Sequence, residues 1–242
     1  MQEWLITQKS KFYLNFIKED RWRYLLDGLG VTLKVTFFAV ILGIVIGMVI
    51  ASVKSTHDKI ADTMRKGLGK FILKFLNFLC NVYLTIIRGT PVVVQLMITY
   101  YIIFKASNNK VLIAILAFGI NSGAYVAEII RSGIMSIDEG QTEAGRSLGF
   151  NYLQTMIYIV VPQAFKNVLP ALANEFIVLL KETSVSGYIA LQDLTKGGDI
   201  IRGRTYDAFM PLLAVAAIYL VMVIFFTKLV NILERRLRRS ER

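Results

Sequence analysis

Long apolar runs without charge limit most strictly what this chain can fold into. The stretch from Val35 to Val53 is apolar or small throughout apart from Thr36 and Ser52, and Leu212 to Phe226 contains no charged residue. A helix needs about 20 such residues to cross the hydrocarbon core of a bilayer. A soluble protein would have to bury these runs in a core, whereas lipid covers them directly. We therefore expect an all-α integral membrane protein.

Five membrane spans account for the hydropathy pattern, and a shorter segment lies on either side of them. Residues 1–24 mix charged and aromatic side chains, which predicts an interfacial, amphipathic segment. Residues 25–233 are predicted to form the transmembrane domain and residues 234–242 a basic tail. The expected spans are about Leu25–Val53, Phe71–Phe104 with an interruption at Gly89-Thr90-Pro91, Val111–Ile130, Leu169–Leu180 and Phe209–Leu233.

The basic residues predict how the chain is oriented. The formal net charge is +11, and the basic residues cluster beside apolar runs, which favours membrane orientation over nucleic-acid binding. Residues 54–74 carry six basic residues and the tail carries five, and five spans place both segments on one side. The positive-inside rule makes that side cytoplasmic and leaves the N-terminus outside, despite its own basic residues. Arg131–Lys166 is then cytoplasmic, and Leu191–Asp207 lies outside.

Small residues recur four positions apart in the first and third spans. Such a stripe lets two helix backbones approach closely in lipid, either in a packed bundle or at a subunit interface. Glycine is also common in membrane helices generally, so the pattern alone leaves both explanations open. The two stripes are Gly43, Gly47, Ala51 and Gly119, Gly123, Ala127.

The segment between the third and fourth spans is predicted to form two short helices joined by a tight turn. Thr142 to Ser147 can form the first helix, which Gly149 can end in a left-handed conformation. Phe150 through Val161 supplies the second helix, and Pro162 is expected to stop or kink it. The result is a compact protrusion. An amphipathic loop lying on the membrane is the alternative.

This segment resembles the "EAA loop" of binding-protein-dependent ABC importer permeases. The family pattern is Glu-Ala-Ala, three residues, Gly, nine residues, Ile, one residue and Leu-Pro. This sequence has the same spacing throughout, with Gly145 in place of the second Ala and Val161 in place of Leu. The resemblance implies a role in coupling to an ATPase for six residues, which are Glu143, Ala144, Gly145, Gly149, Ile159 and Pro162.

Three further segments resemble the polar amino acid permeases of this superfamily, such as those for histidine, glutamine and arginine. Arg88-Gly89-Thr90-Pro91 with Gln95 resembles "RGTP…Q", and Leu180 to Ser184 resembles "LK(D/E)TS". The stretches Gly123–Ile129 and Arg131–Ile134 resemble the approach to the loop. The likeness extends over most of the chain from Leu29 onward, but residues 1–24 carry no family signal.

The resemblance implies a fold, partners and a location. The fold is that of a type I ABC importer permease, which forms a homo- or heterodimer in the bacterial cytoplasmic membrane. Two cytoplasmic ATPases would bind ATP and Mg and dock on the protrusion, and an extracytoplasmic protein would deliver the amino acid. No cofactor is expected in this chain. The implied function is uptake of polar amino acids by alternating access, with basic amino acids among the candidate substrates.

Polar residues inside the spans are candidate substrate contacts, because polar groups at membrane depth are costly. The break at Gly89-Thr90-Pro91 exposes backbone groups that could meet a carboxylate, or it is a structural kink. Acidic residues would favour a cationic substrate, although glutamine or another polar amino acid stays open. The polar stripe of Asn121, Tyr125 and Glu128 could instead pair with Arg88, Arg131 or a residue of the fourth span. The candidates are Thr90, Gln95, Asn121, Tyr125, Glu128, Glu182, Thr183 and Ser184.

The sequence does not predict an enzyme. It lacks the Gly-x4-Gly-Lys-Ser/Thr loop that cradles phosphates, since Phe71 follows Gly69-Lys70 where Ser or Thr is required. One cysteine and one histidine predict no metal cluster. A secondary transporter or channel driven by an ion gradient is the alternative function. It would use the intramembrane carboxylates but would leave the protrusion unexplained.

Overall fold

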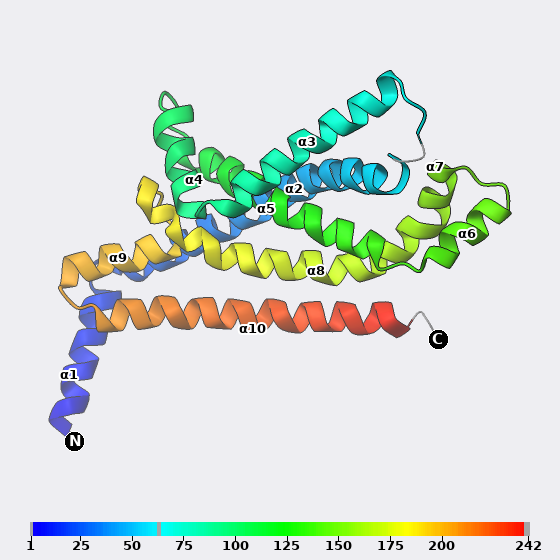
Figure 1. Ribbon diagram of the computed structural model, residues 1–242. Coiled ribbons are helices and arrows are strands. Elements are labelled where there is room, and N and C mark those ends of the chain that lie inside the picture. Colours follow the sequence, from blue (N-terminus) through cyan, green and yellow to red (C-terminus); the bar gives the residue numbers. More distant parts are fainter. Residues whose placement is uncertain (1, 62–63, 240–242) are drawn as a thin grey trace. The chain divides into compact units, whose positions relative to one another are not determined.

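Five long apolar helices dominate the computed structural model, which describes residues 2–61 and 64–239 (Figure 1). Every regular element in these ranges is a helix. The five are α2 (Trp22–Ile60), α3 (Leu68–Gly89), α5 (Lys110–Met135), the succession Tyr152–Ile189, and α10 (Phe209–Arg239). Each is long and apolar enough to cross a membrane. The expectation of an all-α protein with five spans is therefore confirmed.

The predicted second span is divided where its sequence indicated. α3 ends at Gly89, and α4 (Val92–Ile98) begins after Pro91 and continues into a π-helical stretch, η3 (Thr99–Ile103). Thr90 between them is extended, with φ −124° and ψ 145°. A residue before proline is pushed out of the helical region by the proline ring, which explains the break. Of the two parts of this divided span, only α3 is long enough to cross a membrane on its own.

The fourth span is much longer than the predicted Leu169–Leu180. α7 (Tyr152–Thr155), the π-helix η4 (Met156–Val160), α8 (Val161–Glu182) and the 3-10 helix η5 (Thr183–Ile189) follow one another directly. The expectation that Pro162 could stop the helix is wrong, because the helix continues through it. Pro162 lies in the first turn of α8, where proline is tolerated, directly after a π-helical turn.

The N-terminal segment is helical and is fastened to the rest of the chain. It consists of α1 (Gln2–Phe12), η1 (Tyr13–Ile17) and η2 (Lys18–Asp20), after which α2 begins. At the other end, α10 continues through Arg239, so the predicted tail extends the last helix that far. Residues 240–242 of that tail lie outside the described residues.

Two compact units divide the chain. The first unit comprises Met1–Ala39, Val92–Phe118 and Ile177–Thr227, and the second comprises Val40–Pro91, Gly119–Phe176 and Lys228–Arg242. In the first unit, α9 (Leu194–Thr205) packs against the start of α2. The second unit has a core at Ile50, Leu84, Ala124 and Ala127 and another at Ile134, Met156, Val160 and Ala164.

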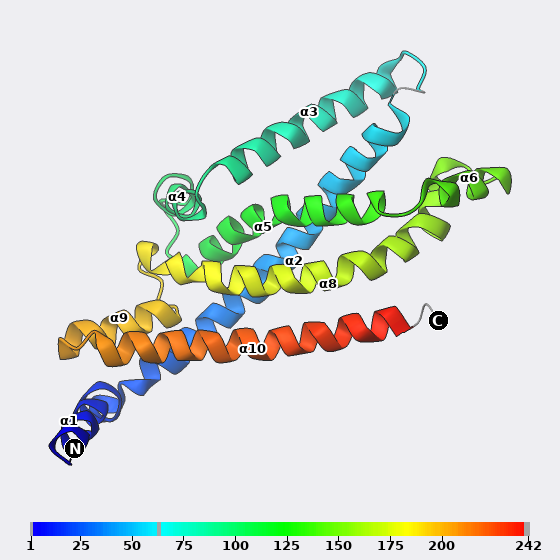
Figure 2. The ribbon, with the colours of Figure 1, turned by 60° about the horizontal axis from the view of Figure 1, so that its bottom comes forward.

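The ribbons of α2 and α5 cross (Figure 2), and within the second unit their small residues pack closely against the facing helix. A Cβ atom on Gly47 would lie 2.5 Å from Cγ1 of Val126 and 2.9 Å from the backbone nitrogen of Ala127. A Cβ atom on Gly123 would lie 2.8 Å from Cγ2 of Ile46. The tight-packing interpretation is confirmed, because a larger residue at either glycine would force the helices apart.

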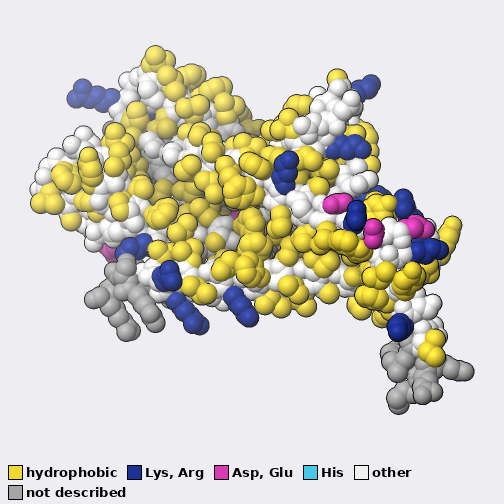
Figure 3. Space-filling view, turned by 180° about the vertical axis from the view of Figure 1, so that it is seen from behind, with side chains coloured by type: hydrophobic (Ala, Val, Ile, Leu, Met, Phe, Trp, Pro, Cys, Tyr) yellow, Lys and Arg dark blue, Asp and Glu magenta, His cyan; other side chains and the backbone are white. Residues whose placement is uncertain are grey.

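The outer surfaces of these helices are apolar, as expected for surfaces that face lipid. Hydrophobic side chains cover most of the face that Figure 3 shows. α3 is the extreme case, since only 6% of its most apolar 18-residue stretch is buried. Such a surface is stable in lipid and would aggregate in water.

Candidate functional site

The protrusion predicted from the "EAA loop" resemblance is a helical hairpin built by local hydrogen bonds. α6 (Glu139–Ser147) begins three residues earlier than predicted, because the Asp138 side chain caps it by accepting from the Gly140 backbone N–H. It ends at Ser147 as expected, and Gly149 has φ +85°. The N–H of Gly149 donates to the Arg146 carbonyl, and that of Phe150 to the Gly145 carbonyl. This pair of bonds is the Schellman motif, which favours glycine at the left-handed position.

The second arm of the hairpin has its own cap. The Asn151 side chain accepts from the Gln154 backbone N–H, and the Gln154 side chain accepts from the Asn151 N–H, both at 2.9 Å. This reciprocal capping box satisfies two N–H groups at the start of α7. The turn from Ser147 to Asn151 is thus specified by residues that lie within it.

Gly145 and Ile159, two residues of the motif, hold the arms of the hairpin together. A Cβ atom on Gly145 would lie 2.9 Å from Cδ1 of Ile159 and 2.9 Å from Thr155. The departure from the family pattern at position 145 therefore brings α6 against η4 and the end of α7. This contact leaves unchanged the side of α6 that carries Glu143 and Ala144, and both of these residues are exposed.

The hairpin is joined firmly to α5 and α8. Ile134 at the end of α5 packs with Met156, Val160 and Ala164. The Asn167 side chain also donates to the Ser136 hydroxyl at 3.0 Å. A force applied to the hairpin is consequently passed to two membrane helices through a packed core rather than through a flexible loop.

The tip of the hairpin presents apolar side chains to its surroundings. Leu148, Leu153 and Tyr158 are 74%, 65% and 69% exposed. A cleft of about 660 Å³ separates the hairpin from the end of α2, and both Glu143 and Arg146 line it. Exposed leucines beside charged groups at the end of a transmembrane helix pair are typical of a protein interaction surface.

Charged residues of the second unit form a row. Glu128 lies 3.8 Å from Arg88 and 3.5 Å from Arg131, and Arg131 lies 3.1 Å from Asp58. The Arg88 guanidinium also lies over the Tyr125 ring, at 5.9 Å from its centroid. The predicted alternative for Glu128, pairing with Arg88 or Arg131, is the arrangement found. Two cations and two anions balance, so this row by itself does not attract a cationic amino acid.

Asn121 and Tyr125 share one helical stripe with Glu128, as predicted, but their surroundings differ. Asn121 is 2% exposed and Tyr125 is 38% exposed. Thr90, in the same unit, donates its hydroxyl to the Ile86 carbonyl at 2.8 Å. The second unit therefore holds Thr90, Asn121, Tyr125 and Glu128 among the predicted substrate contacts.

A buried carboxyl that the prediction overlooked lies in the same unit. Glu175 of α8 is 8% exposed and accepts a hydrogen bond from the Ser122 hydroxyl at 2.8 Å. Ser122 faces Gly43, whose Cβ position lies 2.9 Å from the Ser122 hydroxyl oxygen. The sequence did contain a signal for this carboxyl, because Glu175 is the one charged residue within the predicted span Leu169–Leu180.

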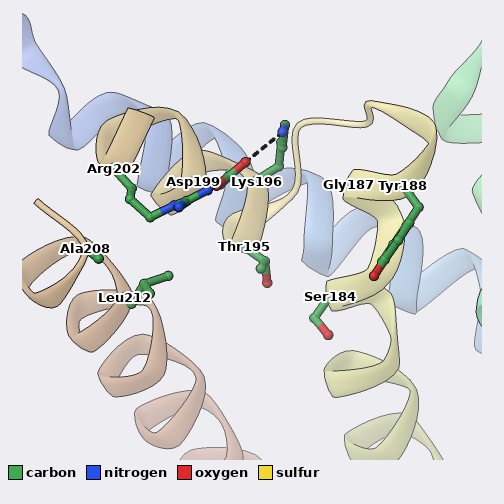
Figure 4. A pocket seen from close by; sticks show the side chains of 9 residues that line it. All are labelled: Ser184, Gly187, Tyr188, Thr195, Lys196, Asp199, Arg202, Ala208 and Leu212. Atoms are coloured by element: carbon green, nitrogen blue, oxygen red, sulfur yellow. Dashed lines mark hydrogen bonds and ion pairs between the residues drawn. The ribbon is translucent and has the colours of Figure 1, made fainter. Parts of the chain in front are cut away.

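The remaining predicted contacts belong to the first unit, in which α4 lies against η5. Gln95 lies on α4, whereas Glu182, Thr183 and Ser184 lie where α8 passes into η5. Thr183 is fully buried and donates to the Leu180 carbonyl. Ser184 lines a pocket of about 520 Å³ between η5, α9 and the start of α10 (Figure 4).

α9 contributes three charged residues to that pocket, from a segment for which the sequence predicted only an external location. Asp199 accepts from Lys196 at 2.8 Å and from Nε of Arg202 at 2.9 Å. Hydrogen bonds from Lys196 and then Arg202 lower the pKa of the Asp199 carboxyl. Asp193, which caps α9, is buried, and that burial raises its pKa.

Comparison with known proteins gives consistent results. The family model of the binding-protein-dependent transport system inner membrane component matches residues 67–239. The putative glutamine transport system permease protein GlnP of Rickettsia prowazekii is 35% identical over 217 residues, which cover 88% of this chain and 93% of that protein. The arginine transport system permease protein ArtQ of Bacillus subtilis is 35% identical over 221 residues, which cover 90% and 94%.

Two solved structures are similar along most of their length. The crystal structure of an amino acid ABC transporter with histidines matches at a TM-score of 0.79 and 42% identity, over 91% of this chain and 98% of that chain. An inward-facing MetNI methionine ABC transporter matches at a TM-score of 0.75 over 89% and 97%, and its 19% identity shows the fold alone.

Proposed function

Because the chain belongs to the family of binding-protein-dependent transport system inner membrane components, we propose that it imports polar amino acids as the membrane subunit of an ABC transporter. The structural likenesses confirm the type I importer permease fold that the "EAA loop" resemblance implied. The chain is a transport subunit, and ATP hydrolysis is assigned to a separate partner chain that binds ATP and Mg.

The exposed hairpin of α6 and α7 is the observation that carries this proposal. Its Schellman turn, its internal packing at Gly145 and its firm attachment to α5 and α8 suit a rigid part that a partner can push. Exposed Leu148 at the turn would enter a groove on a cytoplasmic ATPase, with Glu143 and Ala144 beside it. Closure of two ATPases on ATP would then move the membrane helices as rigid bodies.

The remaining partners and the orientation follow from the same role. A second permease subunit, either a copy or a related chain, would complete the pathway, and an extracytoplasmic binding protein would deliver the amino acid. The hairpin and the C-terminus would lie in the bacterial cytoplasm and the N-terminus outside, as the basic residues after α2 and in the tail indicate.

The proposed substrate is a polar amino acid, in line with relatives whose names specify glutamine and arginine. The substrate contacts proposed from the sequence fall in two groups, one in each unit. Because Arg88 and Arg131 already neutralise Glu128, selection of a basic side chain would have to depend on other groups.

Reconstitution tests the coupling hairpin directly. The chain is placed in liposomes with its subunits, and uptake of labelled glutamine and arginine is measured with and without ATP. Gly149→Glu should abolish ATP-driven uptake and co-purification of the ATPase, because it places a charged side chain at the docking tip. Gly149→Ala introduces the backbone strain without the charge and separates the two effects.

A control glycine and a sidedness measurement complete the test. Gly203→Glu on α9 also adds a charge where no atom lies within 4 Å, and it should leave uptake intact. An engineered thiol at Ser147, in a chain with Cys80 replaced by Ser, should resist impermeant reagents in intact cells. Labelling of that thiol from outside would overturn the coupling role, and uptake that needs no ATP would favour a secondary transporter.

A further inference from the structure

The pocket between η5, α9 and α10 carries a net positive charge. Three charged residues line it, Lys196, Asp199 and Arg202, and together they have one positive charge in excess. Their side chains are 34%, 34% and 50% exposed, so they remain accessible. Lys196 has three N–H donors and Arg202 has five, and bonds to Asp199 leave both able to bind a second anion.

An apolar groove continues from this pocket along α10. It has a volume of about 490 Å³ and is lined by the first two turns of the helix, including Phe209, Leu213 and Ala216. Ala208 and Leu212 line both the pocket and the groove, so the two are contiguous. Figure 4 shows Ala208 and Leu212 on one wall and Ser184 and Tyr188 on the other, with the charged residues of α9 above them.

The charged pocket and the apolar groove are expected at different depths in the membrane. Phe209 begins the transmembrane span of α10, so the groove lies in the outermost turns of the apolar region. α9 precedes that span in the chain, so we expect its charged residues at headgroup level. A phospholipid has the same order of groups, with an anionic phosphate at the surface and acyl chains below it.

We propose that this pocket and groove form a binding site for one anionic phospholipid. Lys196 and Arg202 would bind the phosphate, the Tyr188 hydroxyl would contact the polar headgroup, and one acyl chain would lie along α10 against Leu212 and Phe209. A free phosphate or an amino acid carboxylate would satisfy the cations but would leave the groove empty. The contiguous apolar groove therefore favours the lipid.

The corner that forms the site is held in place by the N-terminal segment. Asn15 is fully buried, donates to the Asp207 carboxylate at 2.9 Å and accepts from the Thr205 hydroxyl at 2.8 Å. These bonds fix the turn that joins α9 to α10, and so fix the cations above the groove. They also give Asn15, in a segment that carried no family signal, a structural role.

Lipid binding can be measured on the full-length chain together with the subunits that copurify with it. The delipidated protein is titrated with phosphatidylglycerol or phosphatidylcholine and examined by native mass spectrometry. One phosphatidylglycerol per copy should bind in preference to phosphatidylcholine. The double substitution Lys196→Gln with Arg202→Gln should weaken binding by at least about tenfold, since each basic residue near anionic lipid contributes roughly fivefold. Equal binding of both lipids, or an unchanged affinity in this variant, would overturn the site.

A matched control removes the same charge elsewhere in the first unit. Lys18 and Arg23 are both exposed and do not line the pocket. Lys18→Gln with Arg23→Gln should bind phosphatidylglycerol as the parent chain does. An equal loss in both double variants would mean that only the overall charge matters, which would also overturn the proposed site.

The groove is tested without changing any charge. Leu212→Trp should fill it and reduce phosphatidylglycerol binding, while binding of inorganic phosphate should change little. An unchanged phosphatidylglycerol affinity in Leu212→Trp, with displacement of the lipid by millimolar inorganic phosphate or glutamine, would show a small-anion site and exclude the lipid. Thermal unfolding of each variant verifies that the fold is intact.

Discussion

α3 and α5 are both apolar enough to cross a membrane, yet only α5 packs deeply inside the chain. In its most apolar 18-residue stretch α5 is 61% buried, whereas the corresponding stretch of α3 is 6% buried. α5 has Gly119, Gly123 and Ala127 on the face that meets α2, while α3 has large side chains such as Phe75 and Phe78 exposed. Apolarity therefore places a helix in the membrane, but small residues decide which helices touch.

The largest expected effect is at the crossing of α2 and α5. Gly47→Leu should lower the free energy of unfolding by about 3 kcal/mol, because even a Cβ atom there would overlap Val126 and the Ala127 backbone. Thermal or denaturant unfolding in detergent measures the loss. Gly30→Leu, on the same helix with no atom within 4 Å of its Cβ position, should leave stability nearly unchanged. Equal losses at the two positions would mean that the close approach is not specific.

A second contact extends the comparison to a helix outside the membrane spans. A Cβ atom on Gly28 would lie 2.5 Å from the backbone oxygen of Asp193, and backbone atoms cannot turn aside as a side chain can. Gly28→Ala should therefore destabilise the chain by about 2 kcal/mol. Gly203→Ala, in the open part of α9, should stabilise it by roughly 0.5–1 kcal/mol, since alanine favours helix. Changes of the same sign in both variants would refute this contact.

The next largest loss of unfolding free energy is expected when the buried pair Ser122–Glu175 is broken. Glu175→Ala removes the acceptor of the Ser122 hydroxyl and leaves a cavity, which should cost about 1–2 kcal/mol. Glu175→Gln keeps an acceptor and should cost much less. Unfolding curves of both variants, recorded beside glutamine uptake, separate stability from transport. If Gln is as harmful as Ala to stability, the hydrogen bond is not what holds α5 to α8.

The smallest effect on the free energy of unfolding is expected for a substitution on α3. Phe75 is 52% exposed, and its ring meets lipid whether or not the rest of the chain is folded. Phe75→Ala should change the unfolding free energy of the chain by less than about 0.5 kcal/mol, because within a bilayer there is no hydrophobic gain in burying it. The same unfolding assay measures it. A loss comparable to that of Gly47→Leu would show that α3 packs in the chain far more tightly than its exposure indicates.

Much of the candidate site could be predicted because it is local. Gly149 takes its left-handed conformation through bonds that reach no farther than Gly145, and Asn151 and Gln154 cap each other three residues apart. The break at Pro91 likewise depends only on neighbouring atoms. The fourth span was predicted too short, because the π-helical turn before Pro162 lets the helix continue where proline alone predicts a stop or a kink.

The amino-acid sequence by itself determined that the chain crosses the membrane five times and carries a capped helical hairpin. Transfer of apolar side chains into lipid and hydrogen bonding within a turn both depend on residues close together in the chain. Only the tertiary structure decided that Glu175 meets Ser122, that Arg88 of α3 reaches Glu128 of α5, and that α9 lies against Gly28. These contacts join residues that are distant along the chain or on different helices, and they depend on which helix faces fit together, which no local pattern encodes.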